Sequence, residues 1–516
     1  MKRLIFLSII FGISFARIIV VPDSAPTIQG GLNLALSGDT VLVKPGQYRE
    51  NITWPNRDGI KLYSLSGPDS TIINGGGNGR VINIPSGITR ATEIRGFKII
   101  GGKANSGAGI YAGGSPTIIR NKICNNTCAG GRDYGGGIFC YYGTSPLIIG
   151  NEITDNTCSD TATWNYGGGI YVDMNSTAEI CYNLIARNTC SQGYWNYGAG
   201  IYVDLRASPL IYQNVIKENI NTLGDRGHGA GIYVSYQANA LIFSNLIIDN
   251  RNTSGSWNYG GGIKVDGRAR IINNTIAGNI CSGGYWAYGA GIYIESDTSI
   301  IKNNIIVQNS STLGSGIYNN GIVINRYNDI WNNIGGNYYG CSPGPGEISL
   351  DPIFVSGPYG PYYLSQTAAG QPVNSPCVDA GDTLLGTTPL NFDSLLRSWT
   401  TRTDSVPDLS VLDMGYHYPR TQPYVGISSI SSKTPIPFQV FPNPFRHFVK
   451  FSPLMKPAPA QIEITDISGK IVYQSASFNY LWKGVNNLGR PLPAGIYFYQ
   501  IRYKNRNHSG RLIKID

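Results

Sequence analysis

The 516-residue chain is poor in charge, in histidine and in long apolar segments. Charged residues make up 14% of it, and it has 4 histidines, at positions 228, 417, 447 and 508. Because these histidines are scattered, a His-based metal cluster or a Ser-His triad has little support. Beyond the first 16 residues no apolar run is long enough to span a bilayer, so we expect no transmembrane segment in the mature chain.

The first 16 residues have the pattern of a secretory signal peptide. Met1-Lys2-Arg3 is followed by an apolar run from Leu4 to Phe15, and Ala16 is a small residue suited to cleavage. A membrane anchor would need a longer apolar run. We therefore predict residues 1–16 to be a signal peptide and the protein to be exported. Its expected place is the cell surface or the extracellular space, with attachment to the outer membrane left open.

The net charge of +9 is concentrated at one end of the chain. Residues 437–516 hold 11 Lys and Arg against 3 acidic residues, and the rest of the sequence is close to neutral. A basic stripe along the body, as nucleic-acid binding requires, is therefore not predicted.

The strongest pattern is an internal repeat of about 31 residues. A Gly-x-Gly-Ile motif occurs eight times, first at Gly107–Ile110 and last at Gly314–Ile317. Between these motifs an Asn-x4-Asn pair recurs with constant spacing, from Asn121 and Asn126 to Asn328 and Asn333. Isoleucine ends each Gly motif, lies two residues after the first Asn, and in all but the last repeat lies three residues before it.

Three isoleucines per repeat, each in a short β-prone run, predict three strands per coil with branched side chains pointing inward. Coils stacked at about 4.8 Å place identical residues above one another. Isoleucines would then fill the bore, and asparagines would hydrogen-bond along the stack. The signatures of leucine-rich repeats and propellers are absent. We predict an all-β chain whose body, residues 17–340, is a right-handed parallel β-helix.

Both ends of this body resemble a known superfamily. Thr27–Leu36 reads as a short amphipathic helix, and with Gly38–Tyr48 it resembles the N-terminal cap of pectin-lyase-like proteins, which include pectin methylesterases and bacterial surface β-helices. Asp351–Phe354, Ser375–Asp382 and Asp413–Tyr416 resemble the closing segment of bacterial right-handed β-helix proteins. The resemblance spans residues 17–420, implies the fold, and makes residues 341–420 the closing segment. It implies no particular activity.

Residues 437–516 form a separate predicted domain after a linker at residues 421–436. Alternating strands between Gly and Pro turns predict a small antiparallel β-sandwich. The motifs resemble, in order, those of the Ig-like C-terminal sorting domain of the type IX secretion system, which implies a partnership with the secretion machinery. An Ig-like accessory module is the alternative. The motifs are Phe441–Phe445, Ile462–Ile467, Ser468–Lys470, Trp482–Gly484, Pro493–Tyr499 and Gly510–Ile515.

One outer face of the predicted helix combines aromatic and acidic columns. In a strand that begins Ile170-Tyr171-Val172-Asp173, alternation points Tyr and Asp outward. Tyrosine rings can stack on sugars while carboxylates accept hydrogen bonds from hydroxyls, so this face is a candidate polysaccharide surface. In the alternative, the rings stack on each other and only cover the turn. The candidate binding residues are Tyr171, Tyr202, Tyr233, Tyr293, Trp164, Trp195, Trp257 and Trp286.

Catalysis would depend on the outward charged residues of the same face. Lys264 interrupts the aromatic column; in calcium-assisted lyases of this fold a Lys or Arg abstracts a proton, whereas an exposed solvating lysine is the alternative. Asp173 and Asp204 should lie in adjacent coils, which makes them candidate Ca²⁺ ligands unless arginines neutralise them. No other cofactor is expected. The candidates are Asp173, Asp204, Asp266, Lys264 and Glu295.

Nine cysteines in an exported chain raise the question of disulfides. Cys128, Cys158 and Cys190 occupy one column in consecutive coils, where one bond is feasible and buried thiols are the alternative. Cys341 and Cys377 are the other candidate pair.

Together these features favour a surface β-helix that binds polysaccharide or an envelope glycan, or acts as an adhesive scaffold, without catalysis. The alternative is a polysaccharide lyase or glycoside hydrolase acting on uronate polymers.

Overall fold

The computed structural model describes residues 16–159, 164–383, 392–409, 411–420, 438–441, 448–453, 461–466, 470–475, 481–503 and 506–514. The chain divides into two compact units, residues 1–426 and 427–516. The predicted signal peptide lies outside the described residues except for Ala16, and the predicted linker, 421–436, lies outside them entirely. In the described part, no helix is long and apolar enough to cross a membrane.

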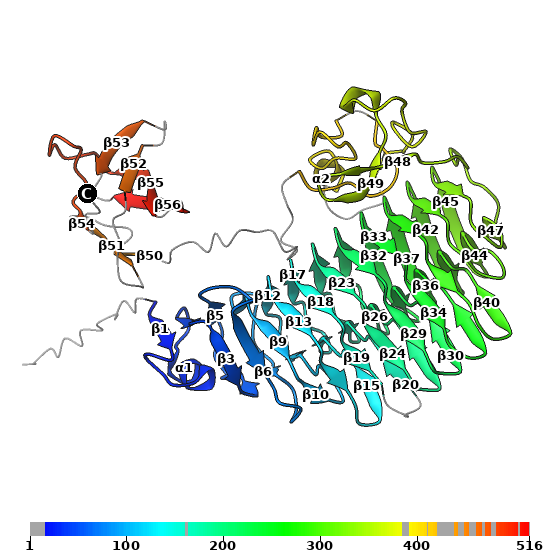
Figure 1. The fold of residues 1–516 in the computed structure, drawn as a ribbon, viewed down its shortest axis with the longest axis horizontal. Helices are drawn as coiled ribbons and strands as arrows, with labels where there is room; N and C mark the ends of the chain where they lie inside the picture. The colour runs from blue at the N-terminus through cyan, green and yellow to red at the C-terminus, as the bar shows by residue number, and fades with distance from the viewer. Residues whose placement is uncertain are drawn as a thin grey trace, which may run out of the picture. The chain divides into compact units, whose positions relative to one another are not determined.

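Three parallel sheets run along the first unit and form a right-handed β-helix (Figure 1). Sheet A contains β1 (Ile18–Val21), β2 (Thr40–Val43), β5 (Lys61–Ser64), β8 (Glu93–Arg95), β12 (Thr117–Ile119), β17 (Leu147–Ile149), β22 (Glu179–Cys181), β27 (Leu210–Tyr212), β32 (Asn239–Phe243), β37 (Arg268–Ile272), β42 (Thr298–Lys302) and β45 (Ile322–Arg326). Sheet B contains β3 (Gly46–Arg49), β6 (Thr71–Asn74), β9 (Lys98–Ile100), β13 (Lys122–Cys124), β18 (Glu152–Thr154), β23 (Leu184–Ala186), β28 (Val215–Lys217), β33 (Leu246–Ile248), β38 (Thr275–Ala277), β43 (Ile305–Val307) and β46 (Asp329–Trp331). Sheet C contains β4 (Ile52–Thr53), β7 (Ile82–Ile84), β11 (Ile110–Ala112), β16 (Ile138–Cys140), β21 (Ile170–Val172), β26 (Ile201–Val203), β31 (Ile232–Val234), β36 (Ile263–Val265), β41 (Ile292–Ile294), β44 (Ile317–Asn319) and β47 (Tyr338–Tyr339).

The middle coils carry two further sheets that the sequence pattern did not predict. They arise because the segment between the second Asn and the Gly motif extends into two more short strands. Sheet D contains β10 (Lys103–Ala104), β14 (Thr127–Cys128), β19 (Thr157–Cys158), β24 (Thr189–Ser191), β29 (Ile220–Thr222), β34 (Arg251–Thr253) and β39 (Ile280–Cys281). Sheet E contains β15 (Arg132–Tyr134), β20 (Trp164–Tyr166), β25 (Trp195–Tyr197), β30 (Arg226–His228), β35 (Trp257–Tyr259) and β40 (Trp286–Tyr288).

The predicted isoleucine columns form the core of the β-helix. In the coil of β21 to β23, Ile170, Ile180 and Ile185 come from sheets C, A and B and have no exposed surface. The strands pair in register, so Ile170 lies beside Ile201 and Ile180 beside Ile211. Each isoleucine therefore contacts its equivalents above and below, and one continuous apolar core runs through the stack.

The paired asparagines form two buried hydrogen-bonded ladders, as predicted. Asn219 shows the pattern: its Oδ1 accepts from the backbone N and the Nδ2 of Asn188, both at 3.0 Å. Its own Nδ2 donates to Ile185 O and to Asn250 Oδ1, both at 2.9 Å. Because every rung repeats these bonds, the side-chain amides of each ladder are satisfied inside the protein.

The ladders stabilise corners whose backbone conformation is otherwise unfavourable. The residue before a ladder asparagine adopts a left-handed conformation even when it is large, as at Tyr182 (φ 56°) and Arg187 (φ 54°). Such conformations cost about 1 kcal/mol or more for residues with a Cβ. At Gly198, in the Gly-x-Gly-Ile motif, φ is 55° and a Cβ would lie 2.5 Å from Ile201 O, so glycine is required there.

Both ends of the stack are covered. The predicted N-terminal helix is α1 (Ile28–Leu34), whose first turn is capped by Thr27 and whose Ile28 and Leu32 are buried on the first coil. At the other end, Glu347 accepts hydrogen bonds from Asn328 Nδ2 at 2.6 Å and Tyr338 OH at 2.6 Å. One asparagine ladder therefore ends on a carboxylate, which accepts the hydrogen bond that the side-chain amide of a further asparagine would have accepted.

Residues 354–418, the flank segment, pack on the side of the β-helix. Their elements are the hairpin of β48 (Phe354–Gly357) and β49 (Gly360–Leu364), a 3₁₀ turn at Thr367–Ala369 and α2 (Phe392–Leu396). Figure 1 shows them beside the strands of the later coils. Phe392, Leu396 and Trp399 bury Phe243 and Ile272 of sheet A. The segment resembling a closing element therefore covers a flank, while residues 338–350 cover the end.

The second unit contains two small antiparallel sheets. One has β50 (Phe438–Phe441), β51 (Val449–Pro453) and β54 (Leu481–Trp482), and the other has β53 (Ile471–Ser475), β52 (Gln461–Thr465), β55 (Gly495–Tyr503) and β56 (Arg506–Lys514). Phe451, Ile464, Trp482 and Leu512 belong to a shared apolar core. Pro442–Phe445, Ile467, Ser468–Gly469 and Ile515, parts of four motifs quoted above, lie outside the described residues.

A single ladder asparagine should contribute much more to the free energy of unfolding than an exposed asparagine. We expect Asn219→Ala to destabilise the protein by about 3 kcal/mol, because it leaves donors on Asn188 and acceptors on Ile185 and Asn250 buried without partners. Denaturant unfolding of the full chain measures this. The control, Asn33→Ala on the exposed face of α1, should change stability by less than about 0.5 kcal/mol. Equal effects of the two substitutions would contradict the role of the ladder.

Candidate functional site

The first residues of the six strands in sheet E form an outward row that we call the ridge. Register pairing places them above one another from coil to coil. Figure 1 shows the strands of sheet E following one another along one edge of the β-helix. Trp286 is 46% exposed, Arg132 is exposed, and the others are partly buried. The ridge consists of Arg132, Trp164, Trp195, Arg226, Trp257 and Trp286.

The ridge side chains stack on each other while keeping one edge in solvent. The Trp257 and Trp286 rings lie 5.3 Å apart at 19°. The Arg226 guanidinium lies 4.1 Å from the centre of Trp195 and 3.5 Å from that of Trp257. A guanidinium between two indoles is held by cation–π attraction on both faces. The ridge is therefore a fixed aromatic surface with cations built into it.

The predicted tyrosine column lies beside the ridge, but its rings are buried. Tyr171, Tyr202, Tyr233 and Tyr293 are 3–6% exposed. Tyr171 and Tyr202 stack at 5.0 Å, and Tyr166 of sheet E meets Tyr202 edge-on at 4.9 Å. The rings of sheets C and E thus fill the corner between the two sheets. Their faces contact each other, so no face is free to stack on a sugar.

The tyrosine hydroxyls are tied to the acidic residues of the next coil. Tyr171 OH donates to Asp204 Oδ2 at 2.5 Å, and Tyr233 OH donates to Asp266. Burial raises the pKa of both tyrosines well above its usual value, and the neighbouring aspartates add to this. These phenols therefore stay protonated and act as donors.

Lys264, the predicted candidate base, is a buried partner of two carboxylates. Its side chain is 4% exposed, and its ammonium contacts Asp266 and, at 3.8 Å, Glu295. The ammonium also lies 5.3 Å from the centre of the Tyr293 ring and 5.4 Å from that of Tyr233. Lys264 therefore occupies the tyrosine column as a buried side chain surrounded by rings and acidic residues. The sequence allowed either a catalytic base or an exposed lysine at this position, and the side chain is not exposed.

His228 replaces a tyrosine in the corresponding column of sheet E. It is buried, and its ring lies 4.8 Å from Tyr197 and 5.4 Å from Tyr259. Burial, with the charges of Lys264 and Arg226, lowers its pKa well below the usual range. The neutral imidazole therefore serves as one more ring of the stack.

Asp173 follows β21 and is a partly buried acid of the same face. Burial, and then the charge of Asp204, raises its pKa to about 6, while a hydrogen bond from Met174 N at 2.7 Å opposes the shift. Ca²⁺ takes six to eight oxygen ligands. Among the described residues no three His, Cys, Asp or Glu side chains are grouped to hold a metal ion. Asp173 and Asp204 together thus supply only part of a calcium site.

All nine cysteines are free thiols in this structure, and the candidate disulfides stay predictions. Cys128, Cys158 and Cys190 do share one buried column, with Ala108 and Ala199, where they pack as small apolar side chains. Cys377 is buried and lies 3.2 Å from Asp329 Oδ2, to which its thiol donates, while Cys341 packs against the end of the core. The column matches the alternative of buried thiols.

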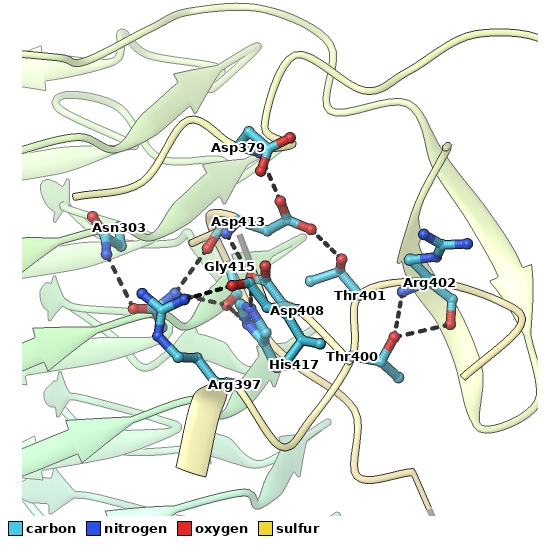
Figure 2. Close-up of polar contacts among 12 residues, drawn as sticks. Asn303, Asp379, Arg397, Thr400, Thr401, Arg402, Asp408, Asp413, Gly415 and His417 are labelled. Carbon is cyan, nitrogen blue, oxygen red and sulfur yellow. Dashed lines mark hydrogen bonds and ion pairs between the residues drawn. The ribbon is translucent and has the colours of Figure 1, made fainter. Parts of the chain in front are cut away.

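A second cluster of titratable groups fixes the flank segment (Figure 2). His417 Nε2 lies 2.9 Å from Asp408 Oδ2, and Asp413 accepts from Thr401 and from Asp379 N at 2.7 Å. Burial opposes the charged form of His417, but Asp408 raises its pKa; burial and Asp408 raise the pKa of Asp413 to about 6. Because His417, Asp408 and Asp413 are all buried, this cluster is a structural junction.

The sequence pattern pointed to the four ridge tryptophans but missed the two arginines. Each ridge residue lies three positions before the first Gly of its Gly-x-Gly-Ile motif, which holds for Arg132 and Arg226 as for the tryptophans. Aligning that position across repeats, whatever the residue type, would have found them.

Two family models match the chain. Residues 50–276 match a right-handed beta helix region, and residues 450–513 match the CHU_C type IX secretion signal domain. The second match indicates export, with attachment at the cell surface or outer membrane, and implies interaction with the secretion machinery. No curated protein matches the chain.

Two solved structures are similar to parts of it. One is PorZ, a surface component of the type IX secretion system of Porphyromonas gingivalis, at 24% identity over 17% of this chain, with a TM-score of 0.15. The chain spans 13% of the length of that protein. The other is a mannuronic acid specific polysaccharide family 6 lyase from human gut microbiota, at 12% identity over 65% of this chain and 92% of that one, with a TM-score of 0.26.

The raised pKa of Asp173 predicts a pH-dependent effect on stability. The folded state holds the Asp173 proton more tightly than the unfolded state, so this residue's contribution to stability falls as pH rises from about 4 to about 6. We expect Asp173→Asn to be more stable than the natural protein at pH 7, by about 1–2 kcal/mol after allowance for its partial exposure. Denaturant midpoints at pH 4 and pH 7 measure the change.

Asp225→Asn is the control of opposite sign. A hydrogen bond from Ser256, with others from Tyr194 and Arg226, holds the pKa of Asp225 below its usual range. Its substitution should lower stability at pH 7, and the loss should shrink as pH falls below 4. If the Asp173→Asn difference were the same at pH 4 and pH 7, the environment assigned to Asp173 would be incorrect.

Proposed function

We propose that this chain, an exported right-handed β-helix carrying a type IX secretion signal domain, binds polysaccharide at the cell surface through its ridge and is not an enzyme. The observation that carries the proposal is the ridge itself, an in-register row of stacked tryptophans and arginines open on one edge. Aromatic rings of this kind offer an apolar surface to sugars at little conformational cost.

The rigidity of the β-helix supports this function. Each ridge residue begins a strand paired with neighbours on both sides or, at the two ends of sheet E, on one side. The stacked tyrosines between sheets C and E hold the ridge strands further in place. A ligand would therefore bind a site that is already ordered, which lowers the entropic cost of association. A glycan chain lying along the ridge could contact several equivalent positions at once, which raises its apparent affinity.

The candidate catalytic residues support binding over turnover. Asp204 and Asp266 accept hydrogen bonds from buried tyrosines, and the Lys264 ammonium is paired with Asp266 and Glu295. Side chains that are paired with each other in this way have a structural role in the outer face of sheet C. The Lys264 ammonium is buried, and Asp266 and Glu295, although partly exposed, are engaged by it, whereas a proton-transfer catalyst must be free to reach the atom on which it acts.

One observation favours the alternative, a uronate-directed hydrolase or lyase. Burial, and then the charge of Asp204, the next acid of the column, raises the pKa of Asp173 to about 6, close to the value that a general acid needs. Pairs of carboxyl groups with pKa values pushed apart are how glycosidases divide the roles of acid and base. Asp173 is the residue on which this second candidate depends.

Loss of an exposed ridge tryptophan should weaken glycan binding. We expect Trp286→Ala in the full chain to reduce affinity for the bound members of a polysaccharide panel about tenfold, equivalent to about 1.4 kcal/mol. Tyr236→Ala, which removes a 59% exposed ring from the turn after β31, is the matched control and should leave affinity unchanged. Affinity electrophoresis or calorimetry measures both. Equal affinities for Trp286→Ala and the natural protein would remove the ridge as the binding surface.

The same panel distinguishes binding from catalysis. We expect no new reducing ends and no unsaturated products after prolonged incubation with any polymer that binds. Release of product that is abolished by Asp173→Asn, with binding retained, would instead establish the enzyme and make Asp173 its acid or base. Asp297→Asn, at a partly exposed acid paired with Arg268 on another face, serves as the control substitution.

A further inference from the structure

The order of residues along the ridge is itself periodic. Going up the coils, the sequence of side chains is arginine, tryptophan, tryptophan, and then the same three again. The two arginines are three coils apart, which at about 4.8 Å per coil is about 14 Å. Along the row, each cation is therefore followed by two indoles.

Arg226 is arranged so that the edge of its guanidinium is available. Both faces are covered by Trp195 and Trp257. Asp225 contacts it only through Nε, at 3.4 Å, and the side chain keeps 20% exposure. Asp225 also accepts hydrogen bonds from Ser256 and Tyr194, so its charge is shared. The terminal N–H groups of Arg226 are the donors that planar anions such as carboxylates bind in a two-point contact.

Arg132, the first residue of the ridge, is stacked on a tryptophan on one side. Its guanidinium lies 4.3 Å from the centre of the Trp164 ring, and the side chain is exposed. Its acidic neighbour Asp133 is fully buried, and the Arg132 side chain also hydrogen-bonds to Tyr134. Two stacked guanidiniums therefore face the same side as the tryptophans.

We infer that the ridge selects polysaccharides whose sugars carry carboxylates, with Arg226 and Arg132 each binding one carboxylate while the tryptophans between them contact sugar rings. This inference rests on the proposed function. It adds the class of ligand: a uronate-type polymer and not a neutral one, with two charges engaged about 14 Å apart. Because a stacked arginine loses little freedom on binding, each contact should be stronger than one to a free surface lysine.

The test compares two polymers that differ only in their carboxylates, polygalacturonate and its carboxyl-reduced form, on the full chain. The variant is Arg226→Trp, which places in this row the residue that its neighbours already have, so the stack and the fold are retained. We expect the natural protein to prefer polygalacturonate. Arg226→Trp should lose about tenfold in affinity for it, so that its preference for polygalacturonate over the reduced polymer falls by at least that factor.

Two further variants check the reading. Arg132→Gln removes the other cation without touching Arg226 and should give a loss in the same direction. Arg268→Gln removes one positive charge from sheet A and should leave the preference intact. Binding of the natural protein to polygalacturonate should weaken with salt, and less steeply in Arg226→Trp, because one ion pair fewer is screened.

The outcomes separate the two proposals. Equal binding of both polymers by the natural protein, or a preference that Arg226→Trp and Arg132→Gln leave intact, would overturn the selection of carboxylates while the glycan-binding ridge stood. Absence of binding to either polymer and to every member of the panel would overturn the proposed function itself.

Discussion

The two asparagine ladders are the interaction on which the rest of this structure depends. Each rung satisfies a buried amide through the rungs above and below, as Asn219 does with Asn188 and Asn250. The ladders sit where the chain turns through a left-handed residue, so they fix corners that sterics alone disfavour. With the corners fixed, the isoleucines are brought into register and the bore closes as one apolar core. At these bends the ladder amides also satisfy buried backbone groups, such as the carbonyl of Ile185.

That register determines what the outside can do. Because each side chain lies above its equivalent in the next coil, a residue type that recurs at one position of the repeat forms a column along the stack. In the corner between sheets C and E the columns are aromatic. Their rings stack face to face, as Tyr171 and Tyr202 do, so these faces are not available to a ligand. One step outward, on the ridge, the same stacking leaves an edge in solvent. The two surfaces have similar composition, and burial alone gives one a structural role and the other a proposed binding role.

The departures from the repeat are of two kinds. Lys264 and His228 replace tyrosines but stay buried. Lys264 is paired with acidic residues and His228 is neutral among aromatic rings, so both keep a structural role in the corner between sheets C and E. Arg226 and Arg132 replace tryptophans and keep an exposed edge. The type IX secretion signal domain indicates export to the cell surface, where an acidic glycan is the ligand that we propose for these two arginines.

The sequence by itself determined the β-helix, the inward isoleucines and the asparagine ladders, because a repeat with fixed spacing allows one in-register packing. Separate motifs indicated the N-terminal helix and the C-terminal sorting domain. It also pointed to the tryptophans. It did not determine sheets D and E, the lateral packing of the flank segment or the free state of the cysteines. Nor could it decide that Tyr202 is covered while Trp286 is open. Alternation tells which side of a strand a residue faces, whereas exposure depends on what another sheet places in front of it. Only the tertiary structure, which folds sheet E against sheet C, supplies that neighbour.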